Sequence, residues 1–169
     1  MTSTPEKTHG PARIRRFRPG EETEVSVLLR RTLMEVNANY CPHSEMVWLY
    51  NRYTPETVAQ IAAENHMYVM LEDGVIVGTG TVTVTGPQEC EIIAAFLLPE
   101  AIGRGLGTRL FQVLEGDEWC RDARRIWLTS SVNALDFYET HGYVNPNGYR
   151  KRDPVNDLLV MEKFPQPQE

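Results

Sequence analysis

A glycine-rich turn between a strand-like run and a helix-like run constrains this chain more than any other feature. It extends from Pro99 to Thr108 and reads PEAIGRGLGT. Glycines at alternate positions let backbone N–H groups approach an anion closely, and the N-terminus of a following helix adds positive potential. The turn is therefore suited to a phosphate or pyrophosphate, with a tight strand-to-helix turn that binds nothing as the alternative. It is not a Walker loop, because no Gly-Lys-Ser/Thr follows, and Thr108 replaces the third glycine of GxGxxG.

Length and composition favour one soluble domain. The chain has 169 residues, of which 41% are hydrophobic and 24% are charged, enough for one hydrophobic core. The polar segments 1–11 and 165–169 are interpreted as tails, so the predicted domain spans 12–164. We expect a cytoplasmic protein that does not bind membranes, because neither a signal-like start nor an apolar run of about 18 residues is present. The net charge of -6 argues against a nucleic-acid partner.

The cysteines argue against both disulfides and metal. Cys41, Cys90 and Cys120 are odd in number and form no CxxC or CxxH group. Reduced thiols and no metal site are therefore expected. Cys90 adjoins Glu91, which raises the alternative of an acyl-cysteine intermediate, whereas a buried strand cysteine is the simpler interpretation.

Hydrophobic periodicity predicts a mixed α/β (α+β) domain with a mostly antiparallel central sheet of about seven strands and about four helices. No clean period is found over 37–53. The predicted helices are an amphipathic one from Glu21 to Val36, a short one capped by Thr54-Pro55-Glu56, one from Gly105 to about Trp119, and one over 134–140. The predicted strands begin near Arg13 and then cover 67–71, 75–85, 91–98, 125–129, 143–149 and 158–163.

Two segments resemble motifs of the GCN5-related N-acetyltransferases (GNAT). The hexapeptide Ile102–Gly107 is similar to the family's Q/R-x-x-G-x-G/A, after a strand ending in Leu97-Leu98-Pro99-Glu100. The segment 133–143, NALDFYETHGY, is similar to N-A-x-x-F-Y-x-x-x-G-F/Y. Their order and separation, and the predicted elements, match the family over about 12–164. One departure is Ile102, which stands where the family usually has Gln or Arg.

The resemblance implies acetyl-CoA as cosubstrate and a primary amine of a small molecule or peptide as acceptor, attacking directly in a ternary complex. The amides of Gly103 to Thr108 would compensate for Ile102 at the phosphates. Main-chain donors from Leu97 or Leu98 would stabilise the oxyanion where the strand splays from its neighbour. The alternatives are a catalytically silent CoA-binding sensor or scaffold, and transfer of a longer acyl group or to a hydroxyl. The implied cofactor-binding residues are Leu97, Leu98, Ile102, Gly103, Arg104, Gly105, Leu106, Gly107, Thr108 and Asn133.

Acetyl transfer to an amine needs a base and an acid, because an amine with a pKa of about 10.4 is mostly protonated at neutral pH. The candidate base is Glu91, which period-2 alternation places on one face with Ile93, Ala95 and Leu97; an exposed Glu that starts the strand is the alternative. By resemblance Tyr138 is the candidate acid, unless it is only a core aromatic.

Two further residues of the second motif have alternative roles. By resemblance, Asn133 contacts the pantetheine or phosphate arm, or else it only caps the following helix. His141, at the end of that helix, is expected to help satisfy its last carbonyls.

The aperiodic segment 37–53 lies where the family lines its acceptor site. Tyr40, Glu45 and Trp48 are the candidate acceptor residues, since aromatic walls with one acid suit an amine. Plain core packing is the alternative. The acceptor stays open among antibiotics, polyamines, amino acids and protein N-termini. Exposed sheet edges in this fold often pair, so a homodimer is among the oligomeric states left open.

Overall fold

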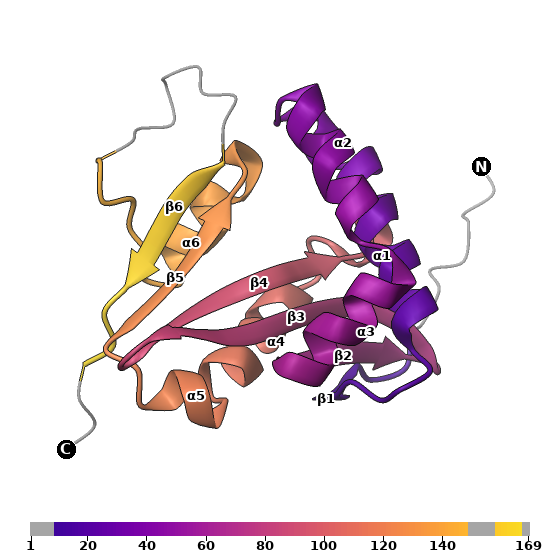
Figure 1. The fold of residues 1–169 in the computed structure, drawn as a ribbon, viewed down its shortest axis with the longest axis horizontal. Coiled ribbons are helices and arrows are strands. Elements are labelled where there is room, and N and C mark those ends of the chain that lie inside the picture. The colour runs from indigo at the N-terminus through magenta and orange to yellow at the C-terminus, as the bar shows by residue number, and fades with distance from the viewer. Residues whose placement is uncertain (1–8, 149–157, 167–169) are drawn as a thin grey trace, which may run out of the picture.

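The computed structural model describes residues 9–148 and 158–166, which form one six-stranded sheet with helices on both faces (Figure 1). The strands follow the order β1-β2-β3-β4-β5-β6, and among the described residues only the β4–β5 pair is parallel. This confirms the mixed, mostly antiparallel α/β class. The strands are β1 Arg13–Arg16, β2 His66–Glu72, β3 Val75–Gly86, β4 Glu89–Leu97, β5 Arg125–Ser130 and β6 Leu159–Lys163. The helices are α1 Glu22–Glu35, α2 His43–Arg52, α3 Pro55–Glu64, α4 Leu106–Glu115, α5 Glu118–Arg121 and α6 Leu135–Thr140.

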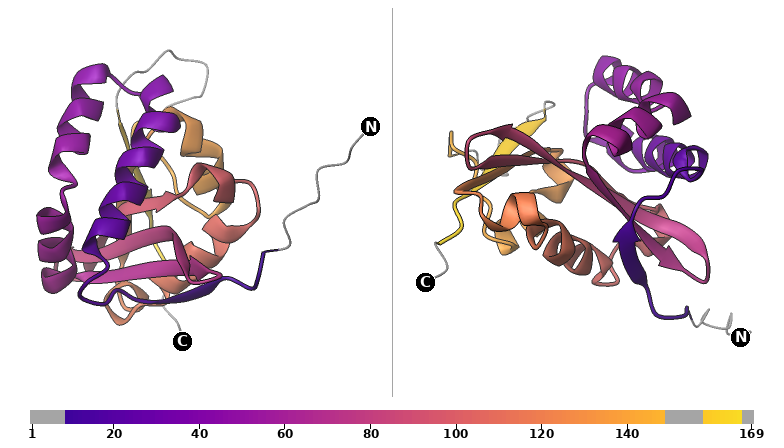
Figure 2. Two further views of the ribbon diagram at one scale, coloured as in Figure 1. Left: turned by 90° about the vertical axis from the view of Figure 1, so that its right-hand side faces the viewer. Right: turned by 60° about the horizontal axis from the view of Figure 1, so that its bottom comes forward.

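Helices lie on both faces of the sheet (Figure 2), and each face carries its own hydrophobic core. On one face, α1 and α3 bury residues such as Val25, Leu29 and Val58. On the other face, α4 buries Leu110 and Leu114 against the sheet, and α6 joins the same core. The predicted amphipathic spacing of α1 and α4 is thus confirmed, because their apolar stripes are the buried ones.

The parallel pair β4–β5 is short and then opens. Its register joins Glu89 to Arg125 and Glu91 to Trp127, and the described part of the structure has no further β4–β5 partners. Beyond Glu91 the two strands diverge, as Figure 1 shows. The end of β4 is therefore paired on one side only, which is the splay that the family resemblance implied.

A β-bulge in β4 changes which residues share a face. Ala94 has φ 49°, and the register shifts so that Thr81 pairs with Ile93 whereas Thr79 pairs with Phe96. A bulge inserts one residue and reverses the alternation beyond it. Ile93 and Phe96 therefore pack on the α1 side, while Ala95 and Leu97 pack on the α4 side. The predicted common face of Glu91 with Ile93, Ala95 and Leu97 is wrong beyond Ile93.

Three predicted elements differ from the structure. The aperiodic segment contains a short 3-10 turn, Asn37–Asn39, and the helix α2, which periodicity missed because only Met46 of that helix is buried. The predicted helix to Trp119 breaks after Glu115, where the Asp117 side chain accepts from the Trp119 amide and starts α5. Over 143–148 only an isolated bridge from Val144 to Glu162 forms, so a full strand there is wrong; Tyr149 lies outside the described residues.

Candidate active site

The glycine-rich turn forms a cradle of backbone N–H groups at the start of α4. Gly103 has φ 80° and Gly105 has φ 76°, conformations that side-chain-bearing residues rarely adopt. Among the described residues, none of the six amides from Gly103 to Thr108 donates to another backbone group. Gly105 is the N-cap of α4 and offers no side-chain cap. Such amides, at the positive end of a helix, are the groups that an anion-binding turn requires.

Helix α6 packs directly against the first turn of α4. A Cβ on Gly107 would lie 3.1 Å and 3.2 Å from two atoms of the Phe137 ring. Nε2 of His141 lies 3.0 Å from the Thr108 hydroxyl, and its Nδ1 lies 2.6 Å from the Phe137 carbonyl oxygen. The expectation that His141 helps satisfy the last carbonyls of α6 is thus confirmed, and the same ring ties α6 to the cradle.

The side chains of Ile102 and Arg104, at the start of the cradle, do not supply polar contacts for a phosphate. Ile102 is 49% exposed and carries no polar atom at the position where the family usually has Gln or Arg. The Arg104 guanidinium makes two hydrogen bonds to the Glu72 carboxylate, at 2.9 Å and 2.6 Å. This ion pair lowers the pKa of Glu72, which lies on β2. Arg104 therefore offers the cradle its amide, while its side chain anchors the turn to the sheet.

The end of β4 presents one candidate oxyanion donor. The Leu98 amide donates to the Val77 carbonyl at 2.8 Å, so it is not available, and the expectation for Leu98 as donor fails. Because backbone groups alternate sides along an antiparallel strand, the Leu97 amide points away from β3, toward the side where β5 has diverged. The Leu97 carbonyl oxygen accepts from the Thr32 hydroxyl at 2.9 Å, which links α1 to this strand end.

Glu91 lies on the α1–α3 face of the sheet, below the end of α2. It is half-buried and pairs with Thr83 on β3. Burial raises the pKa of the Glu91 carboxyl, and the nearby Arg52 guanidinium partly opposes this shift. The alternative of a merely exposed glutamate does not fit this burial. A carboxylate whose pKa is raised is a better base near neutral pH.

Tyr138 lies on the opposite face, in the aromatic core between α4 and α6. It is 9% exposed, and its ring is in edge contact with Phe111, Phe137 and Tyr143 at centroid distances of 5.4 Å, 5.3 Å and 5.8 Å. Its hydroxyl makes no hydrogen bond within the described ranges. Burial raises its pKa, so the phenol keeps its proton at neutral pH. Core packing and proton donation are thus compatible for this residue.

Asn133 does not cap α6. It lies in the 3-10 turn Val132–Ala134, and the N-cap of α6 is Ala134, without a side-chain bond. Its Oδ1 accepts from the Ser131 hydroxyl, which in turn accepts from the Asn37 amide at 3.1 Å. Sequence reasoning missed Asn37 and Ser131, because polar residues in irregular turns carry no periodic signal. The chain of three side chains joins the turn after α1 to the turn before α6.

The acceptor candidates stand on the exposed surface of α2 and the turn before it. Tyr40 is 47% exposed and Trp48 is 58% exposed, so core packing is wrong for both. Glu45 is half-buried, and its position three residues before Trp48 places the two side chains on neighbouring parts of α2. The Arg52 guanidinium lies 5.2 Å from the Trp48 ring centroid. An aromatic and charged surface thus lies near Glu91.

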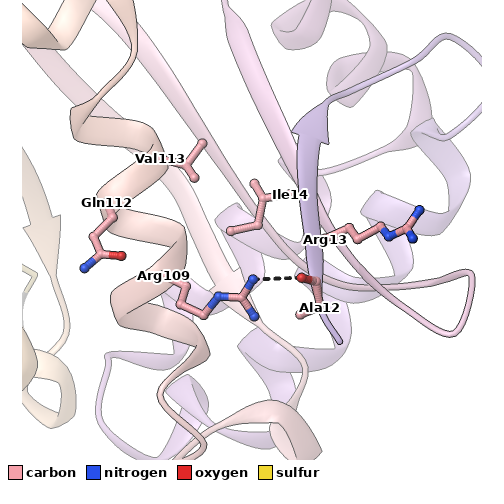
Figure 3. A pocket seen from close by; sticks show the side chains of 6 residues that line it. All are labelled: Ala12, Arg13, Ile14, Arg109, Gln112 and Val113. Atoms are coloured by element: carbon pink, nitrogen blue, oxygen red, sulfur yellow. Dashed lines mark hydrogen bonds between the residues drawn. The ribbon is translucent and has the colours of Figure 1, made fainter. Parts of the chain in front are cut away.

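Two surface hollows lie elsewhere, on either side of β1. One, of about 470 Å³, is bounded by β1 and α4, and there the Arg109 guanidinium donates to the Ala12 carbonyl at 2.8 Å (Figure 3). The other, of about 600 Å³, includes Arg13, Arg15 and Arg18. None of the site residues expected from the sequence lines either hollow. The candidate site therefore lies apart from both hollows.

The structure also describes the cysteines, the side chains that could bind a metal, and the lengths of the apolar helices. Cys41, Cys90 and Cys120 are buried and unpaired by disulfides. Cys90 is 1% exposed, packs on the face opposite Glu91, and its thiol donates to the Trp119 carbonyl at 2.9 Å. In the two described ranges no cluster of three His, Cys, Asp or Glu side chains could hold a metal. No helix in those ranges is long and apolar enough to cross a membrane.

Comparison with known proteins identifies the family to which this chain belongs. The sequence profile of the acetyltransferase (GNAT) family matches residues 32–143, more than half of the chain. The chain belongs to the GNAT family. Among curated relatives, the uncharacterized protein YdhI of Bacillus subtilis is 36% identical over 87 residues, or 47% of this chain and 52% of YdhI. The chain therefore spans about half the length of that relative.

Solved structures share the GNAT fold at low sequence identity. The PaiA N-acetyltransferase of Thermoplasma acidophilum, solved with coenzyme A, has a TM-score of 0.76 at 14% identity and covers 92% of this chain and 99% of its own. A GCN5-related N-acetyltransferase of Rhodopseudomonas palustris has a TM-score of 0.72 at 18% identity, covering 95% and 99%. N-acetylglutamate synthase of Neisseria gonorrhoeae, solved with coenzyme A and N-acetyl-glutamate, has a TM-score of 0.67 at 14% identity. The match covers 92% of this chain and 35% of the synthase.

Proposed function

We propose that this GNAT protein transfers an acetyl group from acetyl-CoA to a primary amine of a small molecule or peptide. The observation that carries the proposal is the cradle of six unpaired amides at the N-terminus of α4, in a chain of an acetyltransferase family. Two related structures hold coenzyme A. A pyrophosphate is the anion of coenzyme A that such a cradle fits, and its backbone donors need no side chain at position 102.

The proposed roles follow the two faces of the sheet. The thioester lies in the opening between β4 and β5, with its carbonyl oxygen near the Leu97 amide. Glu91, on the face below α2, removes a proton from the amine, directly or through one water. Tyr138, on the other face, supplies a proton to the sulfur as the C–S bond breaks; because burial raises its pKa, the phenol carries that proton when the thiolate departs.

Direct attack is preferred to an acyl-cysteine route. Cys90 is buried on the face opposite Glu91, so the two side chains cannot act as nucleophile and base for each other. In a ternary complex the amine, thioester and base meet together, and orientation supplies much of the rate enhancement. The carbonyl carbon forms a bond to nitrogen, and the C–S bond breaks as the thiolate is protonated.

A thermal melt tests the cofactor, and thiol release tests the chemistry. Acetyl-CoA at about 100 times its Kd adds about 2.7 kcal/mol, which raises Tm by roughly 5–10 °C for a domain of this size. ATP and NAD serve as control ligands and are expected to produce no such rise. Thiol release is then measured with polyamines, amino acids, aminoglycosides and peptides as acceptors. No rise in Tm with millimolar acetyl-CoA would contradict the proposal.

A catalytically silent coenzyme A sensor of the same fold is the second candidate. Two observations favour it: Ile102 offers no polar contact, and the Arg104 side chain is committed to Glu72. A sensor binds acetyl-CoA and raises Tm but releases no thiol with any acceptor class. Thiol release that depends on an amine would exclude it, and comparison of acetyl with longer acyl donors and hydroxyl acceptors would define the reaction further.

A further inference from the structure

The ring of His141 makes two hydrogen bonds whose proton positions are constrained. Nδ1 lies 2.6 Å from the Phe137 carbonyl oxygen, and Nε2 lies 3.0 Å from the Thr108 hydroxyl. A carbonyl oxygen can only accept, so Nδ1 carries a proton in both charge states of the ring. The protonation state of Nε2 therefore decides the direction of the hydrogen bond between His141 and Thr108. A neutral ring accepts the Thr108 proton there, whereas a protonated ring donates to the Thr108 oxygen.

Thr108 is also part of the amide cradle. It is the third residue of α4, and its backbone N–H is one of the six unpaired amides. Side chains in the first turn of a helix lean toward its N-terminus, so the Thr108 hydroxyl lies beside the same anion position. A hydroxyl has one proton to give. If that proton goes to a neutral His141, an anion meets only the lone pairs of the oxygen.

We propose that His141 is a positioning residue that couples binding of the cofactor pyrophosphate to uptake of a proton, by turning the Thr108 hydroxyl toward the phosphate. This inference rests on the proposed function, because it requires a pyrophosphate in the cradle. Phosphate oxygens accept and do not donate, so they select the protonated ring, whose Nε2–H satisfies the Thr108 oxygen and leaves the hydroxyl proton free. Affinity for a pyrophosphate ligand then rises as pH falls and the ring takes up its second proton.

The side chains that contact the His141 ring on α4 and α6 are uncharged, so the proposed proton uptake is assigned to the ring. On α4 it meets Thr108 and the Phe111 ring, and on its own helix the Phe137 ring. Lys163 of β6 lies close to Gly142, the residue after His141, and it pairs with Glu115 of α4 at 2.8 Å; the Tyr143 hydroxyl also donates to Glu115.

Other charged groups at the cradle are likewise engaged. Arg104 and Glu72 form an ion pair, and Nδ1 of His9 lies 4.0 Å from Glu72. Among the described residues, His9 is thus an imidazole other than His141 that lies close to the cradle, through its contact with Glu72. It is the competing source of a pH effect.

The test measures binding of acetylated 3′-dephospho-coenzyme A by calorimetry between about pH 5.5 and about pH 8. This probe retains the pyrophosphate but lacks the 3′-phosphate, which itself titrates near about pH 6 as other phosphate monoesters do. Buffers of different ionisation enthalpy report the number of protons taken up. We expect Kd to be about five- to tenfold lower at the acidic end, with proton uptake passing through a maximum of about half a proton per site at an intermediate pH.

Matched variants assign the effect to the pair. His141→Gln and Thr108→Val are expected to abolish the pH dependence and the proton uptake, whereas Thr108→Ser, which keeps the hydroxyl, and His9→Gln retain both. Melting temperatures establish that each variant is folded. A pH dependence that survives in His141→Gln, or that disappears in His9→Gln alone, would overturn the inference.

Binding to the unmodified protein separates this inference from the proposed function. If the probe binds with a Kd independent of pH and without proton uptake, the inference is overturned and the proposed cofactor stands. If neither this probe nor acetyl-CoA binds at any pH, both are overturned.

Discussion

The cradle and the α2 surface are built in opposite ways. The cradle consists of backbone amides held by two glycines at positive φ, and one ring, Phe137, covers its third glycine. The α2 helix buries only Met46, and Trp48 stands 58% exposed upon it. One region is fixed by main-chain geometry and close packing, the other by exposed side chains on a helix that runs beside α1 (Figure 1).

This difference indicates what each region can vary. Backbone donors bind any pyrophosphate in the same way, so the side chains in the cradle can differ from the family pattern, as Ile102 does, without loss of the donors. An exposed helix surface has little packing to maintain, so its side chains can change with the acceptor. The acceptor should therefore depend on α2, and the cofactor on α4 and α6.

The largest effect is expected from Gly107→Val. A Cβ there already lies 3.1 Å from the Phe137 ring, and the added methyl groups must displace α6 from the first turn of α4. We expect Kd for acetyl-CoA to rise about 100-fold or more, with a lower Tm, as measured by calorimetry and melting. Gly86→Val is the control, because a Cβ on Gly86 meets nothing closer than 3.8 Å. A threefold or smaller change in Kd would refute the close-packed account of the cradle.

Glu91→Gln tests whether Glu91, which lies between the cofactor region and the α2 surface, is the catalytic base. If Glu91 is the base, turnover should fall about 100-fold while Kd for acetyl-CoA stays unchanged. Because burial raises the pKa of Glu91, the unmodified enzyme should lose rate as pH falls through that raised pKa and the carboxylate takes up its proton. The variant should lack this acidic limb, and its deficit should shrink as rising pH deprotonates the amine.

The control for Glu91 is Glu89→Gln, two residues earlier on the same face of β4. The Glu89 carboxylate contacts Arg125 at 3.2 Å and accepts from the Thr85 hydroxyl, so it is engaged away from the opening. Its loss should leave the pH profile intact. A deficit in Glu91→Gln that is the same at every pH would contradict the base role.

Tyr138→Phe should separate chemistry from packing on the cofactor side. The hydroxyl has no hydrogen-bond partner among the described residues, so its removal should leave Tm unchanged or slightly higher. As the proton donor, however, its loss should lower turnover about tenfold or more, with Kd for acetyl-CoA retained. Melting, calorimetry and thiol release on the same sample decide the matter. Equal loss of affinity and turnover would assign Tyr138 to packing alone.

The same contrast explains what the sequence predicted and what it missed. The cradle, the helix after it and most strands follow from local signals such as glycine spacing and apolar periodicity, and the structure confirms these elements. The bulge at Ala94 shows only in the register of β4 against β3, and α2 lacks a buried stripe, so neither leaves a periodic trace in the sequence. The Leu98 amide is occupied by a partner 21 positions earlier, Val77, which only the sheet register reveals.

The smallest effect, and the sharpest test of the contrast, comes from Trp48→Ala. An exposed side chain contributes little to stability, so the free energy of unfolding should change by less than about 0.5 kcal/mol, and Kd for acetyl-CoA should not change. Loss of the ring that lies under Arg52 should raise KM for the amine about three- to tenfold, through lost cation–π and apolar contact. Val27→Ala, 60% exposed on α1, is the control of equal exposure. If both variants leave the acceptor KM unchanged, the α2 surface does not bind the acceptor, and the division between a backbone-built cofactor region and a side-chain-built acceptor region fails at Trp48.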